Sequence, residues 1–327
     1  MKFLALFTLT ISSLFGSPFL WMTDDDTSVY VVDTATNTLV QTIPGFSDPQ
    51  GLTFTPNGAF CYIANYGENT VVVINTSNYS VVTTIEDFDE PYFLAASPNG
   101  SYIYVANYGN NTVSVVSTVT NTIVYTITTD LDGPYPLAVS PNGQYLYVGN
   151  YSGDTVSVFN TSDYSLVPTM ISAGETAWIA FAPNGNAYVA DYTNTITVID
   201  PLFSPSSITS GDLSDCYFIS ITPNGNTAYV ANYGTQTVGV IDIAHGNTVS
   251  IASDPSSYLG YAQSLAVSPD GAYVYVPNDQ SLVVVNTSNN TAFQKLTDIV
   301  PTNIYFVAFQ PSQESTRAFR RPENRRA

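Results

Sequence analysis

The stretch Tyr104-Val-Ala-Asn-Tyr-Gly-Asn-Asn-Thr112, followed by Val113-Ser-Val-Val116, decides the fold because versions of it return along the whole chain. A tight turn such as Ser97-Pro-Asn-Gly100 precedes each version, and the unit repeats about every forty residues. Proline fixes φ, and Asn before Gly tolerates positive φ, so each turn predicts a reversal between two strands. A fixed period of this length indicates repeats that share one continuous core.

Each unit contains four short apolar segments, which we name strands a to d in chain order. Strand a precedes the turn, strand b carries a central tyrosine, strand c is rich in valine, and strand d is short. In strand a, large residues flank a small one, as in Leu137-Ala-Val139, and alternation sends them to opposite faces. This pattern suits an innermost strand at a crowded axis. Four antiparallel strands at this period are typical of one β-propeller blade.

The two ends of the repeat complement each other. Segments Leu20–Thr23, Val29–Val32 and Leu39–Ile43 match strands b, c and d, whereas Ile304–Phe309 is a strand a with no clear b after it. We therefore predict an all-β fold, a seven-bladed β-propeller of four-stranded antiparallel blades. A C-terminal strand joins the N-terminal blade and closes the ring, which removes the open edges of a linear array.

Composition divides the chain into three parts. Residues 1–17 combine Lys2, an apolar run and small residues before Pro18, which predicts a secretory signal peptide. Residues 18–311 form the predicted propeller, and we expect no membrane span in the mature chain because no other apolar run is long enough. Residues 312–327 contain five Arg and predict a basic, disordered tail. We expect a monomer that is secreted, periplasmic or at the cell surface.

The units resemble the YVTN β-propeller repeat family, whose consensus runs close to Tyr-Val-Thr-Asn, Thr-Val-Ser-Val-Ile-Asp-Thr-Ala-Thr-Asn and Ser-Pro-Asp-Gly. The matching segments are Tyr104-Val-Ala-Asn107, Thr112-Val-Ser-Val-Val116, Val32-Asp-Thr-Ala-Thr-Asn37 and Ser268-Pro-Asp-Gly271, and the likeness spans residues 20–311. The chain departs from the consensus where Ala106 and its equivalents replace Thr. The resemblance implies a seven-bladed propeller, usually exported or surface-exposed and often of unknown activity. Some relatives resemble lactonases or the propeller of cytochrome d1 nitrite reductase.

Charge is distributed unevenly along the chain. The net charge is −19, and segment 17–311 holds 24 of the 26 Asp and Glu residues, with Lys295 as its only Lys or Arg. The body therefore carries a net charge of −23. Such a surface repels nucleic acid and anionic lipid and favours cations or basic partners. We expect no nucleic-acid partner.

Antiparallel order places the b–c and d–a loops on one face, the top face, and the a–b and c–d turns on the opposite, bottom face. Strand a begins at the top, where tyrosines and amides recur six residues before the turn proline. A ring of aromatic faces inside an acidic rim suits a sugar, an organic cation or a basic protein. We predict ligand binding at Gln50, Tyr92, Tyr135, Trp178, Tyr217, Gln263 and Tyr305. A second aromatic set occupies the b–c loops: Tyr66, Tyr108, Tyr151, Tyr192 and Tyr233.

Acidic residues also concentrate in the top loops. The candidate metal site is the d–a loop with Asp87, Asp89 and Glu90, because carboxylates are the ligands that Ca²⁺ prefers. No other cofactor is expected. The only histidine, His245, belongs to a bottom c–d turn, so no histidine base or zinc site is expected at the mouth of the ring.

Three functional hypotheses follow. The first is a non-catalytic propeller that binds a protein or glycan partner through the top face. The second is a lactonase-like hydrolase that uses carboxylates and Ca²⁺, and the third is a self-associating surface-layer component. A purely structural explanation also exists for the repeated loop Tyr and Asn residues, because such side chains satisfy hydrogen bonds between blades.

Overall fold

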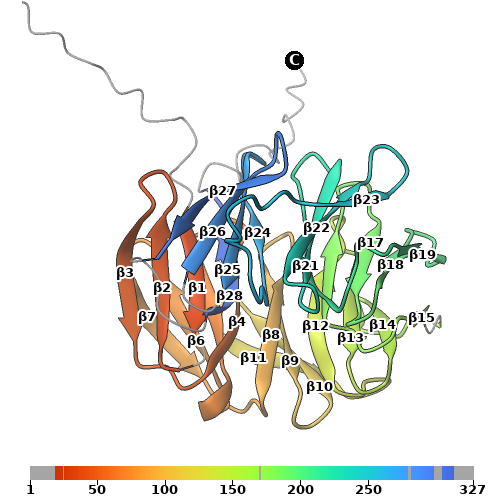
Figure 1. The fold of residues 1–327 in the computed structure, drawn as a ribbon. Coiled ribbons are helices and arrows are strands. Elements are labelled where there is room, and N and C mark those ends of the chain that lie inside the picture. Colours follow the sequence, from red (N-terminus) through yellow and green to blue (C-terminus); the bar gives the residue numbers. More distant parts are fainter. Residues whose placement is uncertain (1–18, 25, 169–170, 279–280, 298–303, 313–327) are drawn as a thin grey trace, which may run out of the picture.

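The structure, a computed structural model, describes residues 19–24, 26–168, 171–278, 281–297 and 304–312. These residues form 28 β-strands in seven four-stranded sheets, with one 3-10 turn, η1 (Tyr66–Glu68). Figure 1 shows the sheets arranged as blades around a central axis. Within this part of the chain, no helix has the length and apolar character needed to cross a bilayer. The predicted signal peptide and the tail from residue 313 onward lie outside the described residues.

The strand order confirms the predicted blades. Blade 1 comprises β28 (Ile304–Phe309), β1 (Phe19–Asp24), β2 (Ser28–Asp33) and β3 (Thr38–Pro44). Blade 2 comprises β4 (Pro49–Phe54), β5 (Phe60–Asn65), β6 (Thr70–Asn75) and β7 (Ser80–Ile85). Blade 3 comprises β8 (Pro91–Ala96), β9 (Tyr102–Asn107), β10 (Thr112–Ser117) and β11 (Thr122–Ile127). Blade 4 comprises β12 (Pro134–Val139), β13 (Tyr145–Asn150), β14 (Thr155–Asn160) and β15 (Ile171–Ser172).

The other three blades repeat the same antiparallel order from strand a to strand d. Blade 5 comprises β16 (Trp178–Phe181), β17 (Ala187–Ala190), β18 (Thr195–Ile199) and β19 (Pro205–Thr209). Blade 6 comprises β20 (Cys216–Ile221), β21 (Thr227–Asn232), β22 (Thr237–Asp242) and β23 (Thr248–Ile251). Blade 7 comprises β24 (Ala266–Val267), β25 (Tyr273–Asn278), β26 (Ser281–Asn286) and β27 (Thr291–Leu296).

The C-terminal strand closes the ring, as predicted. Strand β28 pairs antiparallel with β1, so that Phe309 lies opposite Leu20. Gln310 extends this contact, because its Oε1 accepts a hydrogen bond from Trp21 Nε1 at 3.2 Å. Its Nε2 donates to the carbonyl oxygen of Gly58 in blade 2 at 3.1 Å. One residue therefore ties the closing strand to two blades.

The strand-b tyrosines belong to the core between blades. Tyr62 and Tyr229 are each about 1% exposed, and each belongs to a core cluster that includes residues of the next blade. The Tyr62 hydroxyl donates to Asn121 Oδ1 in the next blade at 2.6 Å, and Tyr229 donates to Asn290 Oδ1 at the same distance. These tyrosines hold neighbouring blades together and are not available to a ligand.

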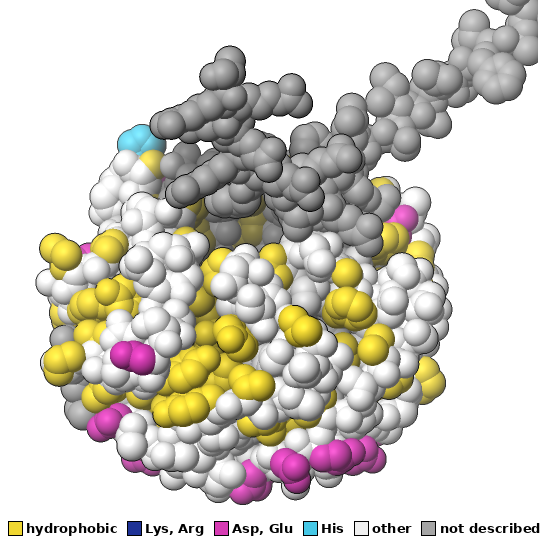
Figure 2. All heavy atoms as spheres, turned by 180° about the vertical axis from the view of Figure 1, so that it is seen from behind, with side chains coloured by type: hydrophobic (Ala, Val, Ile, Leu, Met, Phe, Trp, Pro, Cys, Tyr) yellow, Lys and Arg dark blue, Asp and Glu magenta, His cyan; other side chains and the backbone are white. Residues whose placement is uncertain are grey.

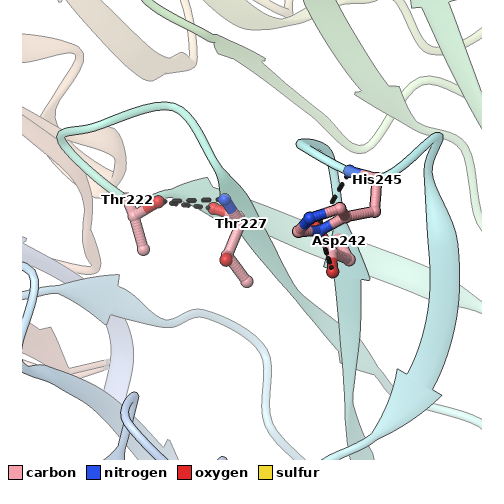
Figure 3. Close-up of polar contacts among 4 residues, drawn as sticks. All are labelled: Thr222, Thr227, Asp242 and His245. Carbon is pink, nitrogen blue, oxygen red and sulfur yellow. Dashed lines mark hydrogen bonds and ion pairs between the residues drawn. The ribbon is translucent and has the colours of Figure 1, made fainter.

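The bottom face repeats one hydrogen-bond pattern. Figure 3 shows it in blade 6, where Thr222 Oγ1 accepts from the N–H of Thr227 at 3.1 Å and donates to its carbonyl oxygen at 3.0 Å. In the neighbouring c–d turn, His245 Nδ1 lies 2.9 Å from the Asp242 carboxylate. The histidine is therefore engaged within its own turn at the bottom face, where the sequence places it.

Candidate functional site

In most blades, the residues at the top end of strand a lie in β-bulges, where the pairing between strands a and b is irregular. In blade 3, Pro91 pairs with Asn107 and Leu94 pairs with Val105, so two residues of β8 oppose one residue of β9. Tyr92 is one of the two. The same kind of bulge contains Tyr135 in blade 4, Tyr217 in blade 6 and Tyr305 in blade 1. A bulge bends the strand locally and re-aims the side chain that it carries.

The four bulged tyrosines meet through their hydroxyl groups. The oxygen of Tyr305 lies 2.7 Å from that of Tyr135, 2.9 Å from that of Tyr92 and 3.1 Å from that of Tyr217. Tyr135 and Tyr217 are also 3.1 Å apart. Because these residues come from blades 1, 3, 4 and 6, the hydroxyl groups converge on the central axis. We call these four residues the tyrosine cluster.

A cavity of about 410 Å³ opens above the tyrosine cluster. Tyrosines of the b–c loops form its walls. The distance between ring centroids is 6.4 Å for Tyr108 and Tyr92, 5.7 Å for Tyr151 and Tyr135, and 5.0 Å for Tyr192 and Tyr217. The whole lining is Tyr92, Tyr108, Tyr135, Tyr151, Tyr192, Tyr217 and Tyr305. The sequence indicates both aromatic sets, but only the fold shows that parts of the two enclose one space.

The hydroxyl groups around the cavity stay protonated at neutral pH. The pKa of Tyr92 is raised, mainly by burial. Burial also raises the pKa of Tyr135 and of Tyr305 well above the ordinary tyrosine value. Burial also raises the pKa of Tyr192, helped by the neighbouring Tyr217. Because these phenols do not ionise readily, they are suited to hydrogen bonding and not to removing protons from a substrate.

Acidic side chains lie beside the cavity walls. Burial is the main cause that raises the pKa of Tyr151, and the negative charge of Glu175 adds to it. Asp48 makes a smaller contribution of the same sign to the pKa of Tyr92. In Figure 2 most visible Asp and Glu side chains lie along one edge, opposite the edge with the histidine. Since His245 marks the bottom face, the acidic edge belongs to the top face.

The structure places Trp178 one residue deeper than the cavity. Strand β16 pairs with β17 without a bulge, and Trp178 lies opposite Ala190 in the regular ladder. Its ring stacks on Phe218 at 4.0 Å and contacts Phe93 at 5.1 Å. Blade 5 instead presents Ala177 at the mouth position, which leaves room for the tyrosines of other blades. Trp178 is one position later in the repeat than the four tyrosines and is equivalent to Phe93, Phe218 and Phe306.

The two predicted glutamines are also outside the cavity lining. Gln50 is 4% exposed, and its Nε2 donates a hydrogen bond to Asp48 Oδ1. Its Oε1 has no hydrogen-bond partner among the described residues. Gln263 is half-buried and precedes the short strand β24. Of the seven predicted binding residues, the structure therefore brings together Tyr92, Tyr135, Tyr217 and Tyr305.

The acidic d–a loop of blade 2 does not assemble a cluster of metal ligands. In the part of the chain that the structure describes, no group of three or more His, Cys, Asp and Glu residues could hold a metal ion. Asp87 is exposed, Phe88 is buried, and Asp89 packs against Gly109. Burial raises the pKa of Tyr66, and the nearby negative charge of Glu90 raises it further. The three acids thus lie in different surroundings.

Comparisons with known proteins support the fold. The family model "Lactonase, 7-bladed beta-propeller" matches residues 75–176, and no curated protein matches the sequence. The structure is similar to Kuenenia stuttgartiensis hydrazine synthase, with a TM-score of 0.71 and 20% identity over 88% of this chain and 100% of that chain.

Two further solved structures share the architecture. A protein of unknown function from Desulfotomaculum acetoxidans has a TM-score of 0.75 and 20% identity, over 90% of this chain and 99% of that chain. A Bacteroides uniformis protein with a provisional assignment as a 6-phosphogluconolactonase has a TM-score of 0.72 and 16% identity, over 90% and 99%. At these identities the likeness concerns the fold, which is that of a lactonase-like seven-bladed propeller.

Proposed function

We propose that this protein is a secreted or surface-exposed, non-catalytic propeller that binds a protein or glycan partner through the tyrosine-lined cavity. The observation that carries this proposal is the convergence of four tyrosines from four blades at the floor of an open cavity. Tyrosine combines a large rigid ring with a polar tip, and it is enriched at the centres of binding interfaces.

The groups around the cavity favour binding over catalysis. The histidine is paired with Asp242 on the bottom face, and the cavity tyrosines hold their protons at neutral pH. A hydrolase needs a positioned group that can accept a proton near pH 7. The cavity lining consists of tyrosines alone, which do not supply such a group.

A triple variant, Tyr92→Ala, Tyr135→Ala and Tyr217→Ala, tests this proposal. We expect it to lose capture of a partner from the surface fraction of the host, because the floor of the cavity is removed. A second triple variant with Phe at the same positions keeps the rings if the Ala variant fails to fold. Tyr273→Ala, at the bottom of blade 7, is the matched control. Undiminished capture by every triple variant that folds would remove the cavity as the binding site.

A lactonase-like hydrolase is the second candidate, favoured by the family-model match over residues 75–176. That region contains Tyr92 and Tyr135 as well as the acidic loop with Asp87, Asp89 and Glu90. Hydrolysis of lactones, followed by acid release with and without millimolar Ca²⁺, tests it directly. A thermal unfolding midpoint that rises with Ca²⁺ would favour this candidate, because ligand binding stabilises the folded state. No acid release and no shift in the midpoint would count against it.

Self-association into a surface layer is the third candidate. The outermost strands expose Val81 and Val82 in blade 2 and Val124 and Tyr125 in blade 3, each at about half of its possible surface. Apolar side chains on strand edges are one way for copies of a chain to associate. Light scattering over a range of concentrations separates the candidates, since a purely monomeric protein rules out self-association.

A further inference from the structure

The tyrosine cluster carries more hydrogen-bond acceptors than donors. Each phenol has one O–H donor and two acceptor lone pairs. The cluster has four phenols and four oxygen–oxygen contacts, so each contact can use one proton. Tyr305 contacts the other three residues, and one donated and two accepted bonds satisfy it completely. All four protons are then used within the cluster.

The surplus lone pairs lie on the other three tyrosines. Tyr92 makes one contact within the cluster and keeps two lone pairs when it donates, while Tyr135 and Tyr217 make two contacts each and keep one lone pair each. Tyr192 donates a hydrogen bond to Tyr217, so it uses the remaining lone pair of Tyr217 and keeps both lone pairs of its own oxygen. A ligand that only accepts hydrogen bonds would have to disrupt the cluster, whereas a donor can bind to it as it stands.

The charge around the cavity has one sign. Asp48 and Glu175 are close enough to act on the pKa of tyrosines in the cavity. Lys295 is the only Lys or Arg among the described residues, and it lies on β27, the outermost strand of blade 7. Aromatic faces also attract cations through the negative charge above each ring. An anionic ligand would meet repulsion here without a compensating basic group.

We propose that the cavity binds a cationic hydrogen-bond donor, namely a guanidinium or primary ammonium group. This inference rests on the proposed function, because it names the chemistry of the ligand for the same site. The donor's N–H groups satisfy the lone pairs of Tyr92, Tyr135 and Tyr192, its charge is balanced by the acidic rim, and its carbon chain lies against the wall tyrosines. Such a group belongs either to an Arg or Lys side chain of a partner protein or to a free amine.

Four small probes separate charge from hydrogen-bond donation. Acetyl-arginine methylamide has both properties. Acetyl-citrulline methylamide has a similar shape and N–H donors but no charge, and the trimethyl-lysine analogue has charge without donors. Glucose represents a neutral sugar. We expect calorimetry to show that the arginine probe binds at least about tenfold more tightly than the other three, as expected for hydrogen bonds to a charged group.

Conservative variants locate the effect. Tyr92→Phe keeps the ring and removes the hydroxyl with two free lone pairs, and we expect binding of the arginine probe about tenfold weaker. Glu175→Gln removes a rim charge, so it should weaken the arginine probe and leave the citrulline probe unchanged. Tyr273→Phe, at the bottom face, is the matched control and should bind the arginine probe like the parent protein. Unfolding midpoints of all variants show that the fold is retained.

The outcomes separate this inference from the proposed function. Equal binding of the arginine and citrulline probes, or preference for glucose, overturns the cationic ligand and leaves a binding site at the cavity. Arginine binding that Tyr92→Phe does not weaken also overturns it. Loss of binding for every probe, together with unchanged partner capture by the triple variants, removes both proposals. Agmatine, a free amine with a guanidinium group, identifies the source, because a tighter complex with agmatine than with the amide probe favours a small amine over a partner side chain.

Discussion

The bottom and top ends of the innermost strands belong to the same repeat, but they differ in how many of their residues recur from blade to blade. At the bottom, Ser97, Ser140 and Ser268 each accept the N–H of the residue five positions later, and Thr55 and Thr222 do the same. At the top, Tyr, Gln and Ala occupy equivalent positions in different blades. One end therefore repeats a structural contact, whereas the other varies its side chains around a shared cavity.

This difference separates two kinds of demand on a repeat. A contact that every blade needs for its own turn recurs with nearly the same residue. A contact that exists once, on the axis, cannot be met by seven identical residues because their side chains would collide. The four tyrosines of the cluster and Ala177 of blade 5 are complementary parts of one arrangement. Variation among the repeats of a single chain thus indicates where a unique site lies.

Removing the closing strand should disrupt both the tyrosine cluster at the top and the closure of the ring. We expect it to have the largest effect on stability. A chain that ends at Pro301 lacks β28, which supplies Tyr305 to the cluster, and it leaves the edge of β1 open. We expect loss of cooperative unfolding in calorimetry, with aggregation through the open edge. A chain that ends at Gln313 keeps every strand and is the control. A shortened chain with a normal unfolding transition would show that closure is dispensable.

Alkaline pH should destabilise the folded state by ionising the strand-b tyrosines that are buried between blades. Burial raises the pKa of Tyr62, Tyr147, Tyr229 and Tyr275 to about 12, from 10 in the unfolded chain. A raised pKa means that their contribution to stability is complete below pH 10 and is lost as the pH rises through 12. Denaturant unfolding between pH 8 and 11.5 should therefore show a steep fall above pH 10.

Absorbance of tyrosinate gives the control for the alkaline experiment. Ionisation of the strand-b tyrosines and loss of circular dichroism should occur together, because the charged forms are not tolerated between blades. Independent ionisation of all tyrosines near pH 10 with unchanged circular dichroism would contradict the role of these residues in the frame.

A reciprocal pair of substitutions sharpens the difference between the two ends. Ser97→Ala removes a buried bottom contact and should lower the free energy of unfolding by about 1 kcal/mol. Ala182→Ser introduces the hydroxyl group that five of the other six blades have at this position, as Ser or Thr, and should raise the free energy of unfolding by a smaller amount. Neither change should alter ligand binding at the top. Denaturant titration measures both, and an effect of Ser97→Ala on probe affinity would contradict the separation.

Asp191→Asn is expected to have the smallest effect. Asp191 is 5% exposed, and burial raises its pKa despite hydrogen bonds from Thr193. Five other blades carry Asn at this position: Asn65, Asn107, Asn150, Asn232 and Asn278. Asn keeps an acceptor for Thr193 and removes a buried charge, so we expect a gain of under about 1 kcal/mol at pH 7. A marked loss of stability would show that the carboxylate has a partner that Asn cannot replace.

The sequence was sufficient for the fold because every blade repeats the same information. The turns, the alternation in strand a and the mismatched ends together predicted seven blades and their closure. The site was predicted less completely. Tyr92, Tyr135, Tyr217 and Tyr305 were identified from their common position, but Trp178 lies one position later in its repeat and packs on Phe93 and Phe218 outside the cavity. The bulges that contain the four tyrosines depend on pairing between strands, which a pattern of residues does not contain.

The bulges at the mouth also bear on how such a protein changes over time. A bulged residue is left out of the regular ladder, so its replacement leaves the pairing of the flanking residues in place. The bulged positions around the axis can therefore be exchanged while the rest of each blade stays intact. For the same reason, substitutions at these few positions could give the fold a new binding specificity.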